Sequence, residues 1–450
     1  MKARWVSLIA LVATCAVLVG VAENRAKDSN PASRFAFLGN AEDNSRQMLN
    51  SGIQVFRFDT FGDQSFWGDQ LHLHEAVNGL SPRNALVLGL KVDAKALSRS
   101  TIEAIKHGKV NLDDPAVTRA LIQQKAVVGV VGFFDNNSDK LRSIGLTCAV
   151  CHSTVDDSVA PGIGMRIDGL ANRDLNVGAI AAAAPKLTPV QQLLQIADPN
   201  QIRQVLLSWG PGKFDAELFL DGKAFQPDGR SAATLIPNAR GLAGHNLHTW
   251  TGGWGSIPYW NAFVAVNEMH GVGTFFDERF DDAAQFPIAA RAQLGHVSTD
   301  PDSDQDTSKL PALQFYQLAL PAVKPRPGID FDVEAAKRGD ELFSGKANCN
   351  SCHREPLWTE PVWNQHTAAE MKIDSFEADR SPGHAYRTMN LAGIFVRERG
   401  LFMNPANKGR FYHDGRFQTL MDVVNSYNDR FNLGLTDQEK QDVVEYLKSL

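Results

Sequence analysis

Cys148-Ala149-Val150-Cys151-His152 and Cys349-Asn350-Ser351-Cys352-His353 are the two stretches that decide how this chain folds. Both have the pattern Cys-x-x-Cys-His, which is the attachment signature of a c-type haem. In this signature the two thiols bond to the two vinyl groups of one haem, and the histidine becomes the proximal ligand of the iron. The predicted residues are Cys148, Cys151 and His152 for the first haem, and Cys349, Cys352 and His353 for the second.

Two other kinds of site use paired cysteines. Four cysteines can hold one zinc ion, and each pair alone can be a disulfide or a thiol-redox centre. Neither alternative requires a histidine directly after both second cysteines. Beyond residue 22 the chain has no cysteines other than these four. The pattern therefore favours two covalently bound haems and redox chemistry.

Residues 1–22 have the pattern of a secretory signal peptide. Lys2 and Arg4 form a basic start, residues 5–20 are an apolar run, and Gly20-Val21-Ala22 is a small-residue cleavage site. The alternative is a retained membrane anchor, but the apolar run is shorter than about 18 residues and no basic stop-transfer segment follows it. We therefore expect cleavage, no integral membrane span after removal of the signal, and a periplasmic or secreted bacterial protein.

The composition is that of an ordinary globular protein. The chain has 450 residues, of which 43% are hydrophobic and 21% charged, and this length predicts two or three domains. The formal net charge is -6, and it becomes -8 when Lys2 and Arg4 leave with the signal. This acidic balance argues against nucleic acid as a partner and is compatible with a basic electron donor.

A proline-rich stretch at residues 321–328 predicts the main domain boundary. It holds three prolines and a glycine in eight residues, which disfavour a helix. We expect a signal peptide (1–22), an N-terminal haem domain with insertions (23–325) and a C-terminal cytochrome c domain (330–450). The predicted fold class is mainly α, with two cytochrome c-like haem domains, the first enlarged by loop-rich insertions.

The C-terminal part has the clearer helix signals. Residues 332–343 have helical periodicity with Asp332 as the capping residue. Gly339 lies inside this helix at a cost of up to about 1 kcal/mol, which close contact with another helix would explain. Thr436 and Glu439 form the capping box of a last helix. We expect these two helices to cross at the glycine.

The N-terminal part is less regular. Helix is predicted at residues 75–76 and 115–130, and two short helices within residues 188–209, each with a capping residue followed by proline. Residues 56–61 have the composition of a short strand or extended segment. Residues 209–260 are rich in glycine and tryptophan, and we expect ordered loops over a haem.

The C-terminal region resembles a known family. Residues 409–420 (GRFYHDGRFQTL) are similar to the His-Asp-Gly signature of the bacterial di-haem cytochrome c peroxidases and their relative MauG. Residues 386–391, the pair Val423-Val424 and residues 435–440 resemble segments of the same family in the same order. The resemblance covers residues 332–450, whereas the first 300 residues match little beyond the haem motif.

The resemblance implies an oxidoreductase that takes electrons from a small cytochrome or cupredoxin and passes them through two haems to peroxide or dioxygen. One alternative is a di-haem electron carrier without catalysis, in which both irons have two protein ligands. Another is a haem dioxygenase similar to the rubber oxygenases, which are di-haem relatives with an enlarged first domain. That last function requires a large apolar pocket beside the first haem.

Several residues are candidates for the sixth ligand of the second iron. Tyr427 lies where the peroxidases carry a methionine and MauG-type enzymes a tyrosine. Met389 and Met403 are alternatives, because a methionine after the haem motif is a common sixth ligand, although methionine also fills cores. His413 is expected to be a structural or haem-edge residue rather than a ligand.

The first iron has a different set of candidates. The peroxidases place a removable histidine soon after the motif, and here Met165 lies at a similar distance instead. An open iron, or a distant histidine, is the alternative; the histidines considered are His245, His248 and His270. Four tryptophans are candidates for electron relay between haems or for simple packing: Trp209, Trp250, Trp254 and Trp260.

Calcium is a further candidate cofactor. Asp302, Asp304 and Asp306 have the spacing that begins a calcium loop. Thr307 stands where that loop needs glycine, and Leu313 where it needs glutamate, so a solvated acidic loop is favoured. The related di-haem enzymes hold a calcium ion between their haems, so a calcium site elsewhere in the chain is the alternative.

Overall fold

The computed structural model describes residues 31–136, 138–227, 229–361 and 363–450. The predicted signal peptide lies outside these residues. The chain divides into two compact units, Met1–Ser51 and Gly52–Leu450. The described part of the first unit is the beginning of one helix, and the cavities and site residues described below belong to the second unit. None of the described helices combines the length and the apolar character needed to cross a membrane.

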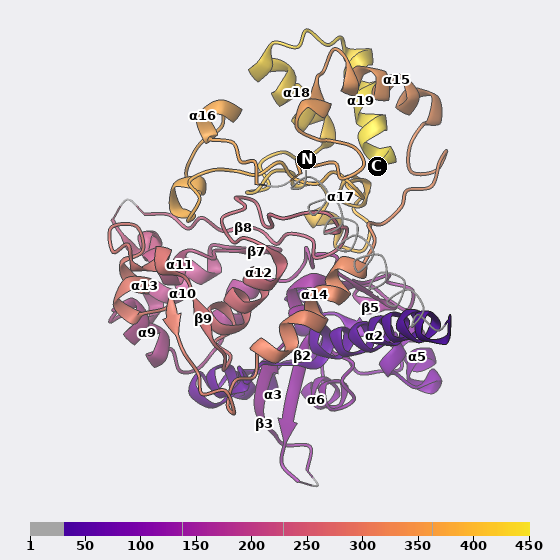
Figure 1. Cartoon of the computed structure of the whole chain (residues 1–450). Coiled ribbons are helices and arrows are strands. Elements are labelled where there is room, and N and C mark those ends of the chain that lie inside the picture. Colours follow the sequence, from indigo (N-terminus) through magenta and orange to yellow (C-terminus); the bar gives the residue numbers. More distant parts are fainter. Residues whose placement is uncertain (1–30, 137, 228, 362) are drawn as a thin grey trace, which may run out of the picture. The chain divides into compact units, whose positions relative to one another are not determined.

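Helices dominate the fold, which confirms the mainly α prediction, and the strands form five two-stranded sheets in the described residues (Figure 1). The helices are α2 (Pro31–Phe58), α3 (Leu73–Asn78), α4 (Pro82–Val87), α5 (Arg99–Lys106), α6 (Pro115–Gln123), α7 (Cys148–His152), α8 (Val177–Ala182), α9 (Thr188–Leu194), α10 (Pro199–Leu207), α11 (Leu218–Asp221), α12 (Ile257–Phe263), α13 (Pro287–Ala292), α14 (Leu310–Ala319), α15 (Val333–Ser344), α16 (Ala368–Met371), α17 (Phe395–Arg399), α18 (Leu420–Phe431) and α19 (Asp437–Ser449). The strands are β1 (Val92–Asp93), β2 (Val130–Phe134), β3 (Leu141–Leu146), β4 (Ser153–Val155), β5 (Ile163–Gly164), β6 (Arg166–Asp168), β7 (Lys213–Phe214), β8 (Thr234–Leu235), β9 (Phe275–Phe276) and β10 (His296–Val297).

Helices α15 and α19 cross as the sequence predicts. Asp332 caps α15 by accepting a hydrogen bond from the Ala335 amide, and Thr436 and Glu439 form the capping box of α19. A Cβ atom on Gly339 would lie 2.0 Å from the Asp442 carbonyl oxygen, so only glycine permits this crossing. These two helices and α18 lie together in Figure 1, and their apolar side chains form a core. Its most buried members include Phe343, Leu420, Val443 and Val444.

The proline-rich stretch has no helix or strand over residues 321–326. It is nevertheless fixed, because the Arg240 guanidinium donates to the Pro321 carbonyl at 2.7 Å and the Gly241 amide donates to the Leu320 carbonyl at 2.8 Å. The division into two haem domains at this stretch stays a prediction.

Two short helices between residues 188 and 209 are confirmed as α9 and α10. Asp198 caps α10 through the Asn200 amide. The first helix differs in detail, since Leu187 is its capping residue and makes no side-chain hydrogen bond. Residues 209–260 are mostly irregular, as expected, and their regular elements are short: β7, α11, β8 and the start of α12.

The prediction for residues 115–130 is only half right. α6 begins at Pro115 but ends at Gln123, and Val130 begins β2, which pairs with β3 as an antiparallel hairpin. Lys125 turns the chain with a left-handed φ of 55°. The valines that looked helical are therefore strand and core residues, which agrees with the β preference of branched side chains.

The strand predicted at residues 56–61 is wrong. α2 continues to Phe58, and the chain then turns at Phe61, whose φ is 53°. Phe56 is fully buried and packs edge-to-face on Tyr316, with ring centroids 5.5 Å apart. Tertiary packing of the helix has overridden the strand preference of the aromatic residues.

Candidate functional site

A cavity of about 320 Å³ surrounds the first haem motif. Thr147 caps the short helix α7 that carries this motif, and Cys148, Cys151 and His152 all line the cavity. Most of the wall is apolar and comes from α3, α4, α6 and the β2–β3 hairpin, with members such as Leu73, Ala85, Leu121, Val130 and Ile144. An apolar cavity of this kind suits the flat face of a porphyrin.

His152 is held in the state that a haem iron requires. Its Nδ1 lies 3.0 Å from the Pro237 carbonyl oxygen, so this nitrogen donates and Nε2 is left to bind a metal. Burial lowers the pKa of His152 to about 4, which keeps the ring neutral at physiological pH. Neutral imidazole is the form that coordinates iron.

The second motif lines a larger cavity of about 650 Å³. Cys349, Cys352 and His353 contribute to its wall, together with apolar residues of α15, α18 and α19. His353 Nδ1 lies 3.0 Å from the Trp358 carbonyl oxygen, which repeats the arrangement at His152. Burial also lowers the pKa of His353. Each motif therefore presents one oriented, neutral imidazole to its own cavity.

The four cysteines are free thiols in two separate cavities, so the structure does not gather them into one zinc site. Burial raises the pKa of Cys148, Cys151 and Cys349 to about 12 and also raises that of Cys352. Thiolates are the form that binds zinc and attacks disulfides. One cysteine pair at each apolar cavity is the arrangement that two attached haems require.

Three arginines in the wall of the second cavity lack an anionic partner in the part of the chain that the structure describes. Arg173, Arg387 and Arg397 line this cavity, and among the described residues none of them pairs with a carboxylate. The Arg173 Nη1 and Arg397 Nε atoms are buried without any hydrogen-bond partner. Burial, with neighbouring arginines, lowers the pKa of both groups. Unpaired buried charge is costly, and the two propionates of a haem are anions that would satisfy it.

The candidate sixth ligands of the second iron all lie at one cavity. Tyr427, Met389 and Met403 line it together with His353. Tyr427 lies partly buried on α18, and desolvation first, then the neighbouring Tyr412, raise its pKa well above the ordinary value. The Met389 sulfur accepts a hydrogen bond from Arg387 Nε at 3.4 Å. The choice among the three stays a prediction.

The candidates for the first iron are separated by the structure. Met165 is 38% exposed and is not part of the cavity wall. His270 lines the cavity, with its ring 3.9 Å from that of Phe66, and burial lowers its pKa to about 4. His245 and His248 are buried outside the wall. Of these candidates, the structure brings only His270 to the first cavity.

The four candidate tryptophans all line the first cavity. Trp260 packs edge-on against His152, with ring centroids 5.2 Å apart. Trp250 and Pro237 are the residues that line both cavities. The Trp250 indole is buried and donates to the Leu235 carbonyl at 2.6 Å. Trp250 is thus the aromatic side chain that the two cavities share.

Three glutamates in the wall of the first cavity were not identified from the sequence, of which Glu217 and Glu377 are buried and Glu268 is partly buried. Glu217, Glu268 and Glu377 come from three separate segments and line the same wall. Burial raises the pKa of all three, to about 8 for Glu217. One oxygen of Glu268 and one of Glu377 have no hydrogen-bond partner. No sequence pattern marks these acids, because only folding places them together in an apolar wall.

The acidic segment at residues 302–306 is only partly solvated. Asp302 is exposed and Asp304 caps its own turn by accepting from the Asp306 and Thr307 amides at 2.8 Å. Asp306 is fully buried, and neither of its carboxylate oxygens has a partner. The solvated-loop prediction is therefore wrong for Asp306. Burial raises its pKa to about 7.

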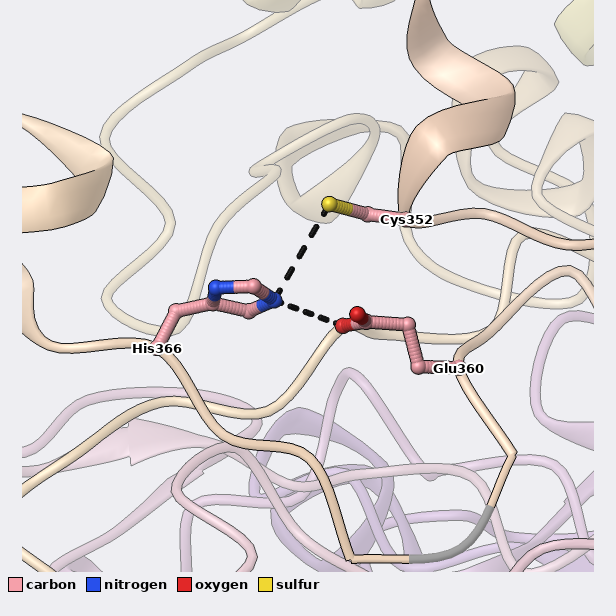
Figure 2. A group of neighbouring side chains, drawn as sticks. All are labelled: Cys352, Glu360 and His366. Carbon is pink, nitrogen blue, oxygen red and sulfur yellow. Dashed lines mark hydrogen bonds and ion pairs between the residues drawn. The ribbon is translucent and has the colours of Figure 1, made fainter.

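One group of potential metal ligands occurs among the described residues: Cys352, Glu360 and His366 (Figure 2). His366 Nε2 lies 3.9 Å from the Cys352 sulfur and 2.6 Å from a Glu360 carboxylate oxygen. This ion pair, with a protonated thiol beside it, offers too few free donors for a four-ligand zinc site. It lies at the point where the second haem would be attached.

No family model matches the sequence. Cytochrome-c peroxidase IdrP1 of Denitromonas iodatirespirans is 30% identical over 154 residues, covering 26% of this chain and 40% of that protein. Hydrazine synthase subunit gamma of Kuenenia stuttgartiensis is 27% identical over 237 residues, covering 44% of this chain and 65% of that subunit. The chain thus spans less than two thirds of the length of both curated relatives.

Two solved structures are also similar. Kuenenia stuttgartiensis hydrazine synthase under xenon gives a TM-score of 0.28 at 20% identity, covering 50% of this chain and 74% of that chain. A MauG-like protein associated with microbial copper homeostasis gives 0.31 at 16% identity, covering 50% and 77%. These values are too low to support an argument about the fold.

The two curated relatives, one of which is a cytochrome-c peroxidase, support a haem protein of the cytochrome c peroxidase kind, at low identity. They support haem iron as the cofactor, which agrees with the two cavities and their oriented histidines.

Proposed function

We propose that this chain is an exported di-haem c-type cytochrome that passes electrons from the second haem to the first, where peroxide or dioxygen is reduced. The observation that carries the proposal is the pair of cavities, each lined by one Cys-x-x-Cys-His motif and joined at Trp250. The electron donor would be a small cytochrome or cupredoxin.

The chain's own residues would hold and orient each group. Cys148 and Cys151, or Cys349 and Cys352, would form the thioether bonds, and Pro237 and Trp358 would fix the proximal histidines through their carbonyls. When bound, a c-type haem supplies an iron that exchanges single electrons and, with an open sixth position, binds peroxide or dioxygen. Arg173 and Arg397 would hold propionates at the second cavity.

The two cavities differ in a way that supports different roles. The second has three possible protein ligands in its wall besides His353, whereas the first has His270 and three carboxyl groups. Reduction of one hydrogen peroxide to two waters takes two electrons and two protons. Neutral carboxyl groups in the wall would supply those protons, as general acids do, and Trp250 would carry electrons between the cavities.

The alternative functions are supported by separate observations. If His270 and a residue of the second cavity both bind iron, the protein is an electron carrier without catalysis. The almost wholly apolar wall of the first cavity is the feature that a rubber-oxygenase-like dioxygenase would need. Both alternatives share the haem sites and differ in what reaches the first iron.

Low-temperature EPR and rapid mixing with peroxide test the proposal on exported, haem-loaded protein. We expect a high-spin ferric signal beside a low-spin one, and oxidation of a reduced cytochrome donor when hydrogen peroxide is added. Two low-spin signals, with no reaction of either the ferric or the half-reduced protein with peroxide, would leave the electron carrier as the function. Reaction with dioxygen only in the presence of an apolar substrate would favour the oxygenase.

A further inference from the structure

We propose that His413 and Glu377 form a proton path from the protein surface to the first cavity, so that Glu377 delivers protons to the reduction of peroxide. This inference deepens the proposed function and rests on it. The geometry that carries it is a buried imidazole of the second cavity beside a buried carboxyl group of the first.

Glu377 forms the inner end of the path. It lines the first cavity, is 5% exposed, and its Oε2 atom has no hydrogen-bond partner. Buried carboxyl groups are normally hydrogen-bonded, so an orphaned oxygen facing a cavity is free to serve something that enters it. Glu217 and Glu268 line the same cavity.

His413 forms the middle of the path. Its Nε2 lies 3.8 Å from Glu377 Oε2, and both side chains are less than a tenth exposed. The imidazole is stacked on Tyr386, with ring centroids 5.0 Å apart, and its backbone carbonyl accepts from the Leu235 amide at 2.7 Å. The ring is therefore fixed, and a small rotation of the Glu377 carboxyl group closes the gap to a hydrogen bond.

Solvent reaches the outer end. Asp414 follows His413 in the sequence, and its side chain is 35% exposed, while that of Asp374 is 40% exposed. Both carboxylates bind the Arg416 guanidinium, with the Asp414 contact at 2.8 Å. Two partly exposed acids therefore lie near the buried imidazole, whose other neighbour is Glu377 in the wall of the first cavity.

The charges around the path favour neutral groups inside it. His413 faces Asp374, Asp414, Arg416 and Lys213, and burial is the main reason why its pKa falls to about 4. Glu377 faces Glu217, Asp215, Asp374 and Asp414; burial first, and these acids second, raise its pKa well above the ordinary value. A neutral imidazole beside a neutral carboxyl group can relay a proton without a lasting buried charge.

The proton balance is simple. Glu377 gives its proton to the oxygen that is being reduced, His413 returns one from Nε2, and the imidazole Nδ1 regains one from solvent beside Asp414. Two such cycles deliver the two protons of one peroxide, and a one-electron donor protein supplies the two electrons. Glu377 ends in its starting state, whereas His413 ends with its proton on Nδ1, so exchange of that proton for one on Nε2 precedes the second cycle.

The first test is Glu377→Gln in the haem-loaded protein, with Glu398→Gln as the matched control. Glu398 is a partly buried acid that also has a raised pKa, but it lines neither cavity. We expect Glu377→Gln to slow peroxide turnover roughly tenfold or more. Loss of a sole general acid costs about 100-fold to 10,000-fold, and here Glu217 and Glu268 remain. The control should keep the wild-type rate.

Two further measurements separate a proton path from a structural role. His413→Gln should slow the same step, and the double variant should be no slower than Glu377→Gln, because both residues lie on one path. In infrared spectra of oxidised minus reduced protein, a band of a neutral carboxyl group should be present and should vanish in Glu377→Gln. His413→Gln also serves as the second variant if Glu377→Gln does not incorporate haem.

Wild-type turnover in Glu377→Gln, or in His413→Gln, would overturn the path. If wild-type protein does not consume peroxide, the proposed function fails, and the infrared spectra still decide the path. A neutral-carboxyl band that responds to reduction and depends on Glu377 supports it, and the absence of such a band overturns it.

Discussion

Single atoms decide how each proximal histidine is presented. The Pro237 carbonyl fixes His152, and Pro237 is also one of the two residues shared by both cavities. The other shared residue is Trp250, which is the only aromatic side chain among the described residues that lines both cavities. Electron transfer between the cavities should therefore be sensitive to the Trp250 indole in particular.

We expect Trp250→Phe to slow electron transfer between the haems roughly tenfold while both haems remain attached. Phenylalanine keeps an apolar ring, but it lacks the larger π system and the N–H that binds the Leu235 carbonyl. Flash photoreduction followed by absorption at both haems measures the rate. Trp254→Phe, a substitution in the first cavity wall only, is the control. Equal slowing in the two variants would contradict the assignment.

Asp306 predicts a pH dependence of stability. Its pKa is about 7 in the folded chain and about 3.9 when unfolded. Between these values the folded state binds more protons, so the free energy of unfolding falls as pH rises. Asp306→Asn removes this fall. The free energy of unfolding of the variant minus that of wild type should rise between pH 4 and pH 7 and level off above pH 7, by on the order of a few kcal/mol in all.

Chemical denaturation of wild type and Asp306→Asn from pH 4 to pH 8 checks this sign. Asp302→Asn, at an exposed position of the same segment, should show no such trend. If Asp306→Asn is instead less stable at neutral pH, the carboxylate is ionised and bound to a cation. That result would support the calcium hypothesis for this segment.

At the scale of elements, the features that depend on neighbouring residues could be predicted from the sequence. The features that depend on packing against distant segments could not. The caps at Asp332, Thr436 and Asp198 were readable because a cap depends on three or four consecutive residues. The end of α6 and the continuation of α2 through Phe58 were missed. Both depend on partners far along the chain, such as Tyr316 for Phe56.

The crossing of α15 and α19 gives a prediction at this scale. Gly339→Ala should push a methyl group against the Asp442 carbonyl oxygen, where only 2.0 Å is available. Overpacking of this kind costs about 1–3 kcal/mol, which should appear as a lower denaturant midpoint and a disturbed spectrum of the second haem. Gly79→Ala is the control, since its Cβ would meet nothing closer than 3.8 Å. No difference between the variants would contradict the packing argument.

At the scale of the whole molecule, the chemistry lies in contacts between distant segments. The sequence identified the motif residues, because five consecutive residues contain the whole signature. It did not identify Glu217, Glu268 and Glu377, or the unpaired Arg173 and Arg397, which meet only in the folded chain. It also proposed Met165, which the structure leaves at the surface.

The two-cavity arrangement makes haem content the most direct test of the account. Intact-mass spectrometry of protein exported from a host that attaches c-type haem should show the mature polypeptide plus two haems. Replacing Cys148 and Cys151 by alanine, or Cys349 and Cys352, should each remove one covalently attached haem and leave the other. A mass equal to that of the polypeptide alone would contradict the central claim. So would the mass of the polypeptide with zinc, or a mass lower by four hydrogen atoms because two disulfides have formed.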